Sequence, residues 1–361
     1  MATKMQQLSD VGQSVWLDNI RRSMFQSGEL RRLIDQGLRG MTSNPTIFEK
    51  AIGHGDDYDE QLRTLVSQAT DPGTLFEKLA IADMRSACDE FRPLFDRTHG
   101  ADGFVSLEVS PTLAHDTQGT IHAAARLWKE VDRPNVMIKI PGTAEGVPAI
   151  RASIAAGINI NVTLVFSVDR YEAAAQAYID GINERVAKDL PVDKIASVNS
   201  VFVSRIDTAI DKLLDAKIRS GETALEDLPG KAGIANLKLV YQRFLKLFNG
   251  DKFARARAAG AHVQRPLWAS TGTKNPAYSD LMYLENVVAR DTVNTVPPQT
   301  LEALEDHGNV RADTILEDLD GARRVIAELA KAQISVYDVT ENLVAEGVKS
   351  FAESFTALLE A

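Results

Sequence analysis

The feature that most constrains the fold of this 361-residue chain is a repeated alternation of short strand-like segments with longer amphipathic ones. Amphipathic segments with apolar residues at the helical period include 120–131, 147–156, 169–188 and 202–218. Between such segments we predict eight strands, at Ser14–Asp18, Leu38–Asn44, Phe104–Val109, Val136–Ile140, Ile158–Val165, Ile195–Ser200, Arg265–Ser270 and Asp291–Val296. Eight strands that alternate with helices predict an α/β fold in which a parallel sheet closes into a (β/α)8, or TIM, barrel.

Three regions are longer than a minimal strand–helix unit. Residues 53–100 hold two helical stretches, residues 204–260 form a helical insertion, and residues 310–361 are helical with breaks at Gly321 and near Ser335. No stretch rich in Pro, Gly or Ser divides the chain, and no Gly-x-Gly-x-x-Gly or Walker sequence follows a strand. We therefore expect residues 1–361 to form a single domain that is not a nucleotide-binding fold.

Charge and composition exclude several classes of function. The net charge of -10 opposes binding to nucleic acid or to an anionic membrane, because both require concentrated lysine and arginine. No apolar stretch reaches the roughly 18 residues that span a bilayer, and the chain has no signal-peptide pattern. Its single cysteine excludes an internal disulfide, and its six histidines lack the spacing of a zinc site. We expect a cytoplasmic protein without a metal.

Lys139 is the residue that least fits an ordinary strand. In Val136–Ile140 the aliphatic residues alternate onto one face, which sends Lys139 to the other face just before Pro141 ends the strand. Burial disfavours the charged form of a lysine, and a neutral amine is a nucleophile toward carbonyl groups. Taken alone, this pattern favours a surface lysine on an edge strand, or one paired with a nearby carboxylate.

Polar residues on other strands share the phase of Lys139. In the fifth strand the aliphatic residues, Leu164 among them, are expected to face outward toward helices, while the polar residues face into the barrel. The inward polar set is Asp18, Asn44, Ser106, Glu108, Asn159, Asn161, Thr163 and Ser200. Such a set costs stability, and barrel enzymes place their catalytic groups at the carboxyl ends of strands, so it predicts an active site. Individually, Asp18 also fits a helix cap, Asn44 a turn, and Glu108 a surface charge.

A lysine beside two carboxylates is suited to Schiff-base catalysis. Lys139 would attack a ketone, the carbinolamine would lose water, and the resulting iminium would act as an electron sink for cleavage of a carbon–carbon bond. Asp18 and Glu108 are the available acid and base groups. Asparagine and threonine side chains would orient hydroxyl groups or a water molecule.

The same residues resemble the transaldolase family along all eight strands. The matching motifs are Thr42-Ser43-Asn44-Pro45, Ser106-Leu107-Glu108, Val136-Met137-Ile138-Lys139-Ile140-Pro141, Asn161-Val162-Thr163 and Ser200-Val201-Phe202-Val203-Ser204-Arg205. The resemblance implies that Lys139 forms the Schiff base, Glu108 is the acid/base, and Asp18 handles protons at the hydroxyl group of the donor. It implies that Thr163 positions the catalytic water, that Arg205 clamps a phosphate, and that substrate contacts come from Asn44, Asn161, Ser200 and Phe202. The alternative for Arg205 is an ordinary helix arginine.

The seventh strand departs from the family pattern. Many transaldolases have Ser-x-Arg there, whereas this chain has Ser270-Thr271-Gly272-Thr273-Lys274. We expect Ser270 to contact substrate and Lys274 to replace the arginine as the second phosphate cation, aided by backbone amides near Gly272. The alternative for Lys274 is a solvated surface charge. This sequence and the chain length are similar to a bacterial transaldolase branch that is sometimes fused to phosphoglucose isomerase.

The resemblance implies reversible transfer of a dihydroxyacetone unit from sedoheptulose 7-phosphate to glyceraldehyde 3-phosphate, which yields erythrose 4-phosphate and fructose 6-phosphate. It implies no metal or organic cofactor, because the lysine iminium is the electron sink. The nearest rival is a fructose-6-phosphate aldolase, in which Glu108 is typically glutamine and Phe202 typically tyrosine. The other rival is a catalytically inactive barrel that binds sugar phosphates or a partner. The presence of Lys139, Asp18 and Glu108 opposes this interpretation. We expect a monomer or a homodimer.

Overall fold

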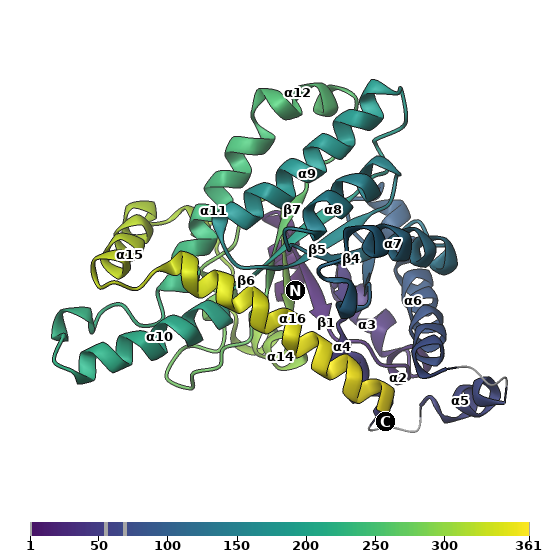
Figure 1. Cartoon of the computed structure of the whole chain (residues 1–361), viewed down its shortest axis with the longest axis horizontal. Coiled ribbons are helices and arrows are strands. Elements are labelled where there is room, and N and C mark those ends of the chain that lie inside the picture. Colours follow the sequence, from purple (N-terminus) through teal and green to yellow (C-terminus); the bar gives the residue numbers. More distant parts are fainter. Residues whose placement is uncertain (1, 54–56, 68–70, 361) are drawn as a thin grey trace.

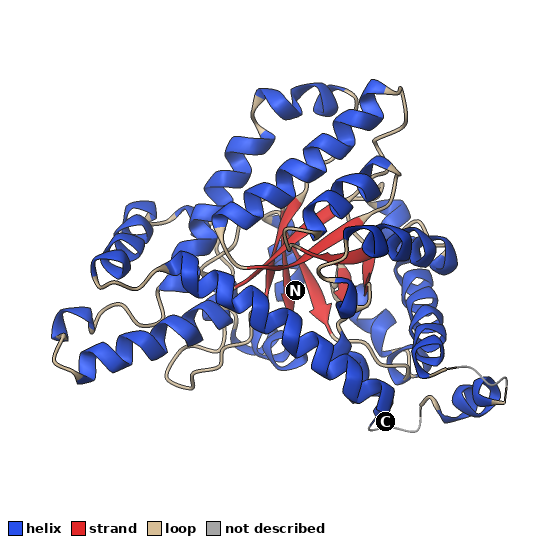
Figure 2. Cartoon of the chain, viewed as in Figure 1, coloured by secondary structure: helices blue, strands red, loops and turns tan. Residues whose placement is uncertain are grey.

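A closed barrel of eight parallel strands forms the centre of the computed structural model, which describes residues 2–53, 57–67 and 71–360. The strands are β1 Gln13–Asp18, β2 Gly40–Thr42, β3 Phe104–Glu108, β4 Val136–Pro141, β5 Ile160–Val165, β6 Ser197–Phe202, β7 Arg265–Ala269 and β8 Thr292–Val296. Each strand pairs in parallel with its neighbours in sequence, and β8 pairs with β1 to close the barrel (Figure 2). The predicted (β/α)8 barrel is therefore confirmed, and β2 is the strand most shortened relative to its prediction.

Helices surround the barrel and extend beyond it (Figure 1). They are α1 Lys4–Asp10, α2 Ser23–Gln26, α3 Glu29–Asp35, α4 Pro45–Gly53, α5 Asp59–Val66, α6 Pro72–Arg97, α7 Thr117–Val131, α8 Gly146–Ala155, α9 Val168–Ala187, α10 Ser204–Arg219, α11 Ala232–Phe248, α12 Asp251–Ala258, α13 Met282–Glu285, α14 Pro298–His307, α15 Leu319–Lys331 and α16 Val336–Glu360, with short 3-10 turns η1 Pro111–Leu113, η2 Thr223–Leu225 and η3 Thr314–Leu316. Among the described residues, no helix is long and apolar enough to cross a membrane.

The helices predicted over 120–131, 147–156, 169–188 and 202–218 correspond to α7, α8, α9 and α10. The last of them begins two residues later than predicted, at Ser204, because Phe202 still belongs to β6. The three long regions are helical, with α5 and α6 in the first, α10 to α12 in the second, and α15 and α16 in the third. Residues 54–56 and 68–70 of the first region lie outside the described residues.

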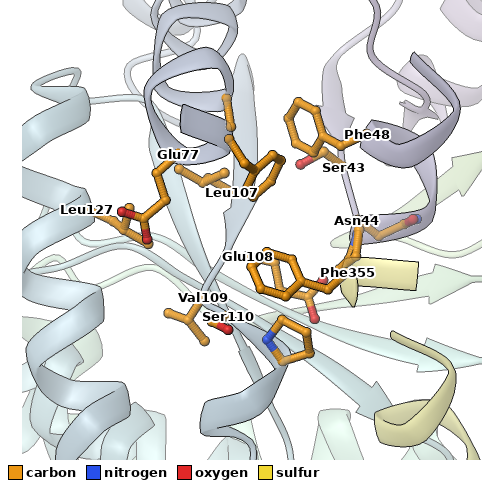
Figure 3. A pocket seen from close by; sticks show the side chains of 14 residues that line it. Ser43, Asn44, Phe48, Glu77, Leu107, Glu108, Val109, Ser110, Leu127 and Phe355 are labelled. Carbon is orange, nitrogen blue, oxygen red and sulfur yellow. The ribbon is translucent and has the colours of Figure 1, made fainter. Parts of the chain in front are cut away.

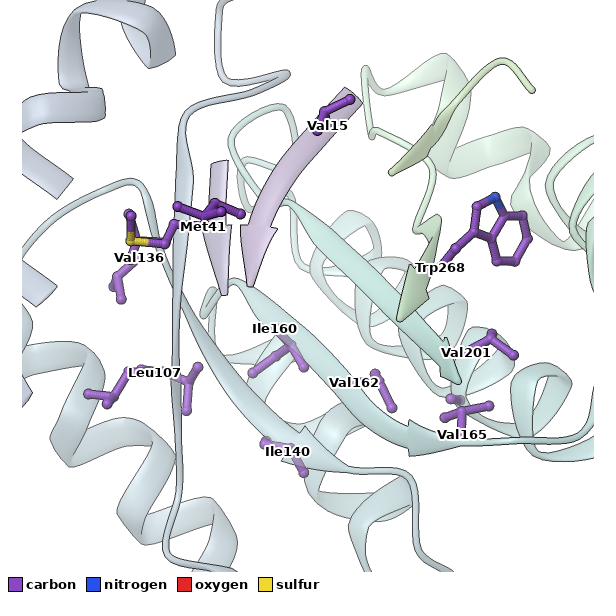
Figure 4. Close-up of a cluster of buried hydrophobic side chains, with 14 of the residues drawn as sticks. Val15, Met41, Leu107, Val136, Ile140, Ile160, Val162, Val165, Val201 and Trp268 are labelled. Atoms are coloured by element: carbon purple, nitrogen blue, oxygen red, sulfur yellow. The ribbon is translucent and has the colours of Figure 1, made fainter. Parts of the chain in front are cut away.

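Two faces of each strand build two parts of the core. Outward aliphatic side chains such as Val136, Ile160 and Val162 pack against the helices (Figure 4). Side chains on the opposite face of the strands point into the barrel. In its amino half they are large and apolar, namely Trp16, Phe104, Met137, Val198, Leu267 and Val293. Gly40 makes room for this filling, since a Cβ there would lie 2.5 Å from the Trp16 ring. The polar residues of the carboxyl half therefore lie above an apolar floor.

The strand β5 contains an irregularity that corrects one prediction. Its register with β6 shifts between Val162 and Val165, and Leu164 within the shift has φ of 56°. Leu164 was expected to face outward with Val162, but it packs with Phe202 and with residues of α16 instead. An extra residue in one strand reverses the phase of the side chains beyond it, so a strict period of two is wrong at this position.

The C-terminal segment reaches the carboxyl end of the barrel through α16. Gly321 does not break α15 as predicted, because its N–H donates to the capping carboxylate of Asp318 at 2.9 Å and lies in the first turn of the helix. The predicted break near Ser335 is confirmed by the gap between α15 and α16. Figure 1 shows α16, in yellow, running across the barrel, and it packs against α4, α10 and β5.

Candidate active site

A cavity of about 970 Å³ opens where the barrel strands end and α16 crosses them. All of the predicted site residues line it except Glu108 and Asn161, which lie behind its wall: Asp18, Asn44, Lys139, Thr163, Ser200, Phe202, Arg205, Ser270 and Lys274. The eight strands are parallel, so residues far apart in sequence meet at the same end of the barrel. The structure thus brings the predicted residues together around one space.

Lys139 lies inside the barrel and is paired with a carboxylate. The β3–β4 register places Glu108 beside Lys139, and Lys139 Nζ lies 3.1 Å from Glu108 Oε2. Both side chains are buried, at 6% and 4% exposed, and the same ammonium donates to the backbone oxygen of Ser43 at 3.1 Å. A closed barrel has no edge strand, so the edge-strand interpretation of Lys139 is wrong, and the surface interpretation of Glu108 is wrong as well.

Asp18 lines the same cavity and is held by a threonine. Thr42 Oγ1 donates to Asp18 Oδ1 at 2.7 Å and also lies 2.7 Å from Thr295 Oγ1. Burial raises the pKa of Asp18, and the Lys139 ammonium, the Thr42 hydrogen bond and the charge of Lys274 partly oppose the rise. Burial also raises the pKa of Glu108, which Lys139 partly opposes. Two carboxyl groups with raised pKa values beside one amine are suited to proton transfer.

A chain of hydrogen bonds supports the cavity floor. The side-chain amide of Asn161 donates to Ser106 Oγ at 2.9 Å, and Ser200 Oγ donates to Asn161 Oδ1 at 2.7 Å. Asn161 therefore lies beneath the cavity lining and positions the Ser200 hydroxyl, while one of its amide N–H groups and one oxygen lone pair stay uncommitted among the described residues. Thr163 Oγ1 is buried and has no hydrogen-bond partner among the described residues, which leaves it available to a water or substrate oxygen.

A second, narrow pocket lies on the far side of Glu108 (Figure 3). Apolar side chains such as Phe48, Leu107 and Phe355 dominate its lining. Neither carboxylate oxygen of Glu108 has a further hydrogen-bond donor within the described ranges besides its ion pair. Glu108 thus stands between an apolar space and the polar site.

Asn44 links the site to α4. Its Oδ1 accepts a hydrogen bond from the backbone N–H of Ile47 at 2.9 Å, which caps the helix that begins at Pro45. The oxygen of Asn44 is therefore a helix cap, and not part of the turn given as its alternative role. The residue also lines the cavity, so its amide nitrogen is close to any bound ligand.

Three cations lie around the cavity. The Arg205 guanidinium lies 5.6 Å from the Phe202 ring centroid, and no ion pair joins it to another described residue. Burial lowers its pKa, which the charge of Glu346 partly opposes. Lys274 is exposed at the rim, and Lys50 of α4 lines the same cavity. These side chains supply local positive charge to a protein with a net charge of -10.

Ser270 takes a backbone conformation that is uncommon for a residue with a side chain. Its φ is 55°, in the left-handed region, at the end of β7. Its hydroxyl lies 2.9 Å from Ser204 Oγ, and the Ser204 N–H donates to the Ser270 oxygen at 3.2 Å. The end of β7 is thereby tied to the start of α10, next to Arg205.

Comparison with known proteins shows the family of the chain. The sequence model of the transaldolase/fructose-6-phosphate aldolase family matches residues 15–361. The chain belongs to this family. Among its relatives, the transaldolase of Parafrankia sp. (strain EAN1pec) is 47% identical over 100% of this chain and 97% of its own. The transaldolase of Trichodesmium erythraeum (strain IMS101) is 44% identical over 98% and 95%, and that of Mycolicibacterium smegmatis is 46% identical over 98% and 95%.

Some residues of this transaldolase-family site were not predicted. Thr295 follows the inward phase of β8, so alternation along that strand would have found it. Lys50 and Phe351 lie on helices outside the barrel and carry no local pattern that marks them. Within the described residues, no group of three or more His, Cys, Asp or Glu side chains is arranged to hold a metal ion.

Proposed function

We propose that the protein is a transaldolase of the pentose phosphate pathway that works through a Schiff base on Lys139. The observation that carries the proposal is the buried Lys139 amine, 3.1 Å from Glu108, at the base of a polar cavity. Support comes from relatives named transaldolase that are 44–47% identical over nearly the whole chain. The donor is sedoheptulose 7-phosphate, the acceptor is glyceraldehyde 3-phosphate, and the products are erythrose 4-phosphate and fructose 6-phosphate.

Schiff-base formation uses Lys139, Glu108 and Thr163. Lys139 Nζ attacks the ketone carbon of the donor, and the carbinolamine that forms loses its hydroxyl group as water to give an iminium. Glu108 lies close enough to Nζ to accept its proton and to return one to the departing hydroxyl group. The free Thr163 hydroxyl orients that water, and it orients the water that later hydrolyses the product iminium.

Transfer of the three-carbon unit uses Asp18. The iminium accepts the electrons of the C3–C4 bond while Asp18 removes the proton of the C4 hydroxyl group, so an aldehyde leaves and an enamine stays on Lys139. The enamine carbon then attacks the carbonyl of the acceptor, and the proton held by Asp18 passes to the new hydroxyl group. Hydrolysis of the resulting iminium releases the product ketose and the amine.

Binding of the substrate phosphate uses the cations at the rim. Arg205 and Lys274 lie on the β6 and β7 side of the cavity, with Ser270 between them in sequence. A phosphate bound there neutralises charges that have no ion-pair partner among the described residues, and charge-assisted hydrogen bonds are the strong ones. Substrate hydroxyl groups contact Asn44, Ser200 and Ser270, and Phe202 packs against the sugar. Asn161 contacts the substrate beside Ser200, to which it is hydrogen-bonded.

The second activity within the family is fructose-6-phosphate cleavage without transfer. Glu108 and Phe202 favour transfer, because the resemblance associates glutamine and tyrosine at these positions with the aldolase. The names of the most similar relatives favour it as well. The proposal also includes a single domain over residues 1–361, which the closure of one barrel by β1 and β8 supports. It further includes a cytoplasmic location and a monomer or homodimer. The net charge of -10 supports the absence of a nucleic-acid partner.

The test is to incubate the protein with fructose 6-phosphate, reduce it with borohydride and locate the adduct by peptide mass. We expect a dihydroxyacetone adduct on Lys139, no adduct on the Lys139→Met variant, and consumption of fructose 6-phosphate that depends on erythrose 4-phosphate. An adduct on another lysine contradicts the mechanism. Equal cleavage with and without the acceptor assigns the aldolase activity instead.

A further inference from the structure

Phe351 of α16 covers one side of the cavity, next to Lys139. Its ring centroid lies 5.8 Å from Lys139 Nζ, and its side chain is 4% exposed. It lines the same cavity as Asp18 and Thr163, although it comes from the C-terminal helix rather than from a barrel strand. A buried aromatic ring at this place limits how water reaches the amine.

The helix α16 packs against Leu164 of β5 at Gly347. Gly347 lies one turn before Phe351 on the same helix face, and a Cβ at Gly347 would lie 2.8 Å from Leu164 Cδ2. Leu164 reaches this point because its φ of 56° turns it out of the β5 ladder and toward α16. The bulge and the glycine together set how closely α16 approaches the barrel, and therefore where Phe351 lies.

Two further contacts fix α16 on either side of Phe351. Arg170 forms an ion pair with Glu341 at 2.5 Å and donates to the backbone oxygen of Gly142, next to the end of β4, at 3.0 Å. Toward the other end, Ser354 Oγ lies 2.8 Å from Thr46 Oγ1 of α4. Phe351 is thus held by polar contacts that lie before and after it along the helix.

We propose that Phe351 is a specificity-determining residue, which favours transfer of the three-carbon unit over its release by keeping water from the intermediate on Lys139. The inference rests on the proposed transaldolase function. Between the two half-reactions the enamine must wait for an acceptor aldehyde. An apolar ring over the nitrogen leaves no ordered donor on that side, and the aldehyde remains able to enter from the open side of the cavity.

The competing release has a defined chemistry. A proton donor, water or an acid that water reaches, protonates the enamine carbon, and the C=C electrons form the new C–H bond to leave an iminium. Water then adds to the iminium carbon, the C–N bond breaks, and dihydroxyacetone and the free Lys139 amine result. Because Schiff-base formation released one water, the overall reaction is cleavage of the ketose phosphate into dihydroxyacetone and an aldehyde. Greater access for water at Phe351 increases this path relative to transfer.

The test compares variants of one helix by a ratio of two rates. The ratio divides dihydroxyacetone release from fructose 6-phosphate alone by transfer to erythrose 4-phosphate, so the amount of folded enzyme cancels. We expect Phe351→Leu to raise the ratio roughly tenfold, equal to about 1.4 kcal/mol of barrier difference. We expect Gly347→Ala, which keeps the ring and displaces the helix, to change the ratio in the same direction.

The matched control is Val344→Ala, which shortens a buried residue of α16 in the same apolar cluster but outside the cavity lining. If α16 acts through Phe351, Val344→Ala should leave the ratio unchanged. If the ratio rises in Val344→Ala as well as in Phe351→Leu, a general loosening of the helix is the cause and the inference is overturned. A wild-type ratio in Phe351→Leu, with the borohydride adduct still on Lys139, overturns it as well. Absence of transfer by the wild-type protein contradicts the proposed function, which is a separate result.

Discussion

The two ends of the barrel each hold an ion pair, and the pairs differ in how completely their atoms are hydrogen-bonded. At the amino end Arg265 Nη1 lies 3.0 Å from Asp102 Oδ1. Ser14 Oγ donates to the same carboxylate at 2.7 Å, and Arg265 donates further to Ser14 Oγ at 2.7 Å and to the backbone oxygen of Thr292 at 2.6 Å. This pair joins β1, β7 and β8 to the segment before β3.

At the carboxyl end the ion pair of Lys139 and Glu108 has fewer hydrogen bonds. Glu108 has no donor other than Lys139 among the described residues, and the neighbouring Thr163 hydroxyl has no partner there either. Unpaired buried polar atoms cost stability, so their presence needs an explanation beyond folding. The comparison indicates that a saturated ion pair holds strands together, whereas an unsaturated one is available to a substrate.

The sharpest test of this contrast is Glu108→Gln, which removes charge from the unsaturated pair while keeping its shape. We expect kcat for transfer to fall about 100- to 1000-fold, because proton transfer to and from the carbinolamine is lost. The free energy of unfolding should fall by up to about 2 kcal/mol, because the Lys139 ammonium loses its counter-charge but keeps the glutamine oxygen and the Ser43 backbone oxygen as acceptors. Steady-state kinetics and urea denaturation measure the two quantities. A large loss of stability with an unchanged kcat would reverse the assignment.

The opposite result is expected for Arg265→Met at the amino end. Asp102, whose side chain is 13% exposed, then loses its cation, and the hydrogen bonds from Arg265 to Ser14 and Thr292 are lost as well, so the free energy of unfolding should fall by about 3 kcal/mol. The value of kcat for the folded enzyme should remain within about twofold, because the apolar floor that contains Trp16 and Met137 separates this pair from the cavity. Urea denaturation and kinetics at a temperature where the variant is folded check both.

A double variant controls for other losses at the amino end. Arg265→Met combined with Asp102→Asn removes both charges, so part of the lost stability should return if the unpaired carboxylate is its cause. Additive losses in the double variant would mean that packing of the arginine, and not the ion pair, stabilises this end.

The same contrast explains which parts of the site could be predicted from sequence. Lys139, Glu108 and Asp18 sit on strands whose side chains alternate locally, so their common phase is visible without a structure. The strand segments themselves were predictable for the same reason. The saturation of the two ion pairs was not, because Asp102, Ser14 and Arg265 come from separate parts of the chain and meet only in the closed barrel.

Two features near Lys139 depend on tertiary contacts that no local pattern reports. The bulge at Leu164 changes the phase of β5 after Val162, and the prediction failed there. Phe351 belongs to a helix whose apolar face is ordinary in sequence, and its place over Lys139 follows from the contact between Leu164 and Gly347. Sequence reasoning therefore found the polar groups that meet at the cavity and missed the aromatic residue that lies next to Lys139.

The smallest expected effect concerns Asp18, a site carboxylate that accepts a hydrogen bond from a neutral side chain. Thr42 donates to Asp18 and thereby holds the pKa of Asp18 below the value that burial alone would give. In Thr42→Val this bond is absent, so the pKa of Asp18 should rise further. Because ionised Asp18 accepts the C4 hydroxyl proton, a higher pKa leaves less of the active form at acidic pH and changes nothing well above it.

The acidic limb of the kcat/KM profile against pH should therefore move to higher pH in Thr42→Val, by up to about one pH unit, as expected for one hydrogen bond of about 1 kcal/mol. Thr295→Val is the matched control, because Thr295 must donate to Thr42, whose own proton goes to Asp18, and so acts one bond further away. The acidic limb of the Thr295→Val profile should therefore move less than that of Thr42→Val. If the acidic limb of Thr42→Val is unchanged or moves to lower pH, Asp18 is not the base. Its hydrogen-bonded carboxylate would then have a structural role, like that of Asp102 at the amino end.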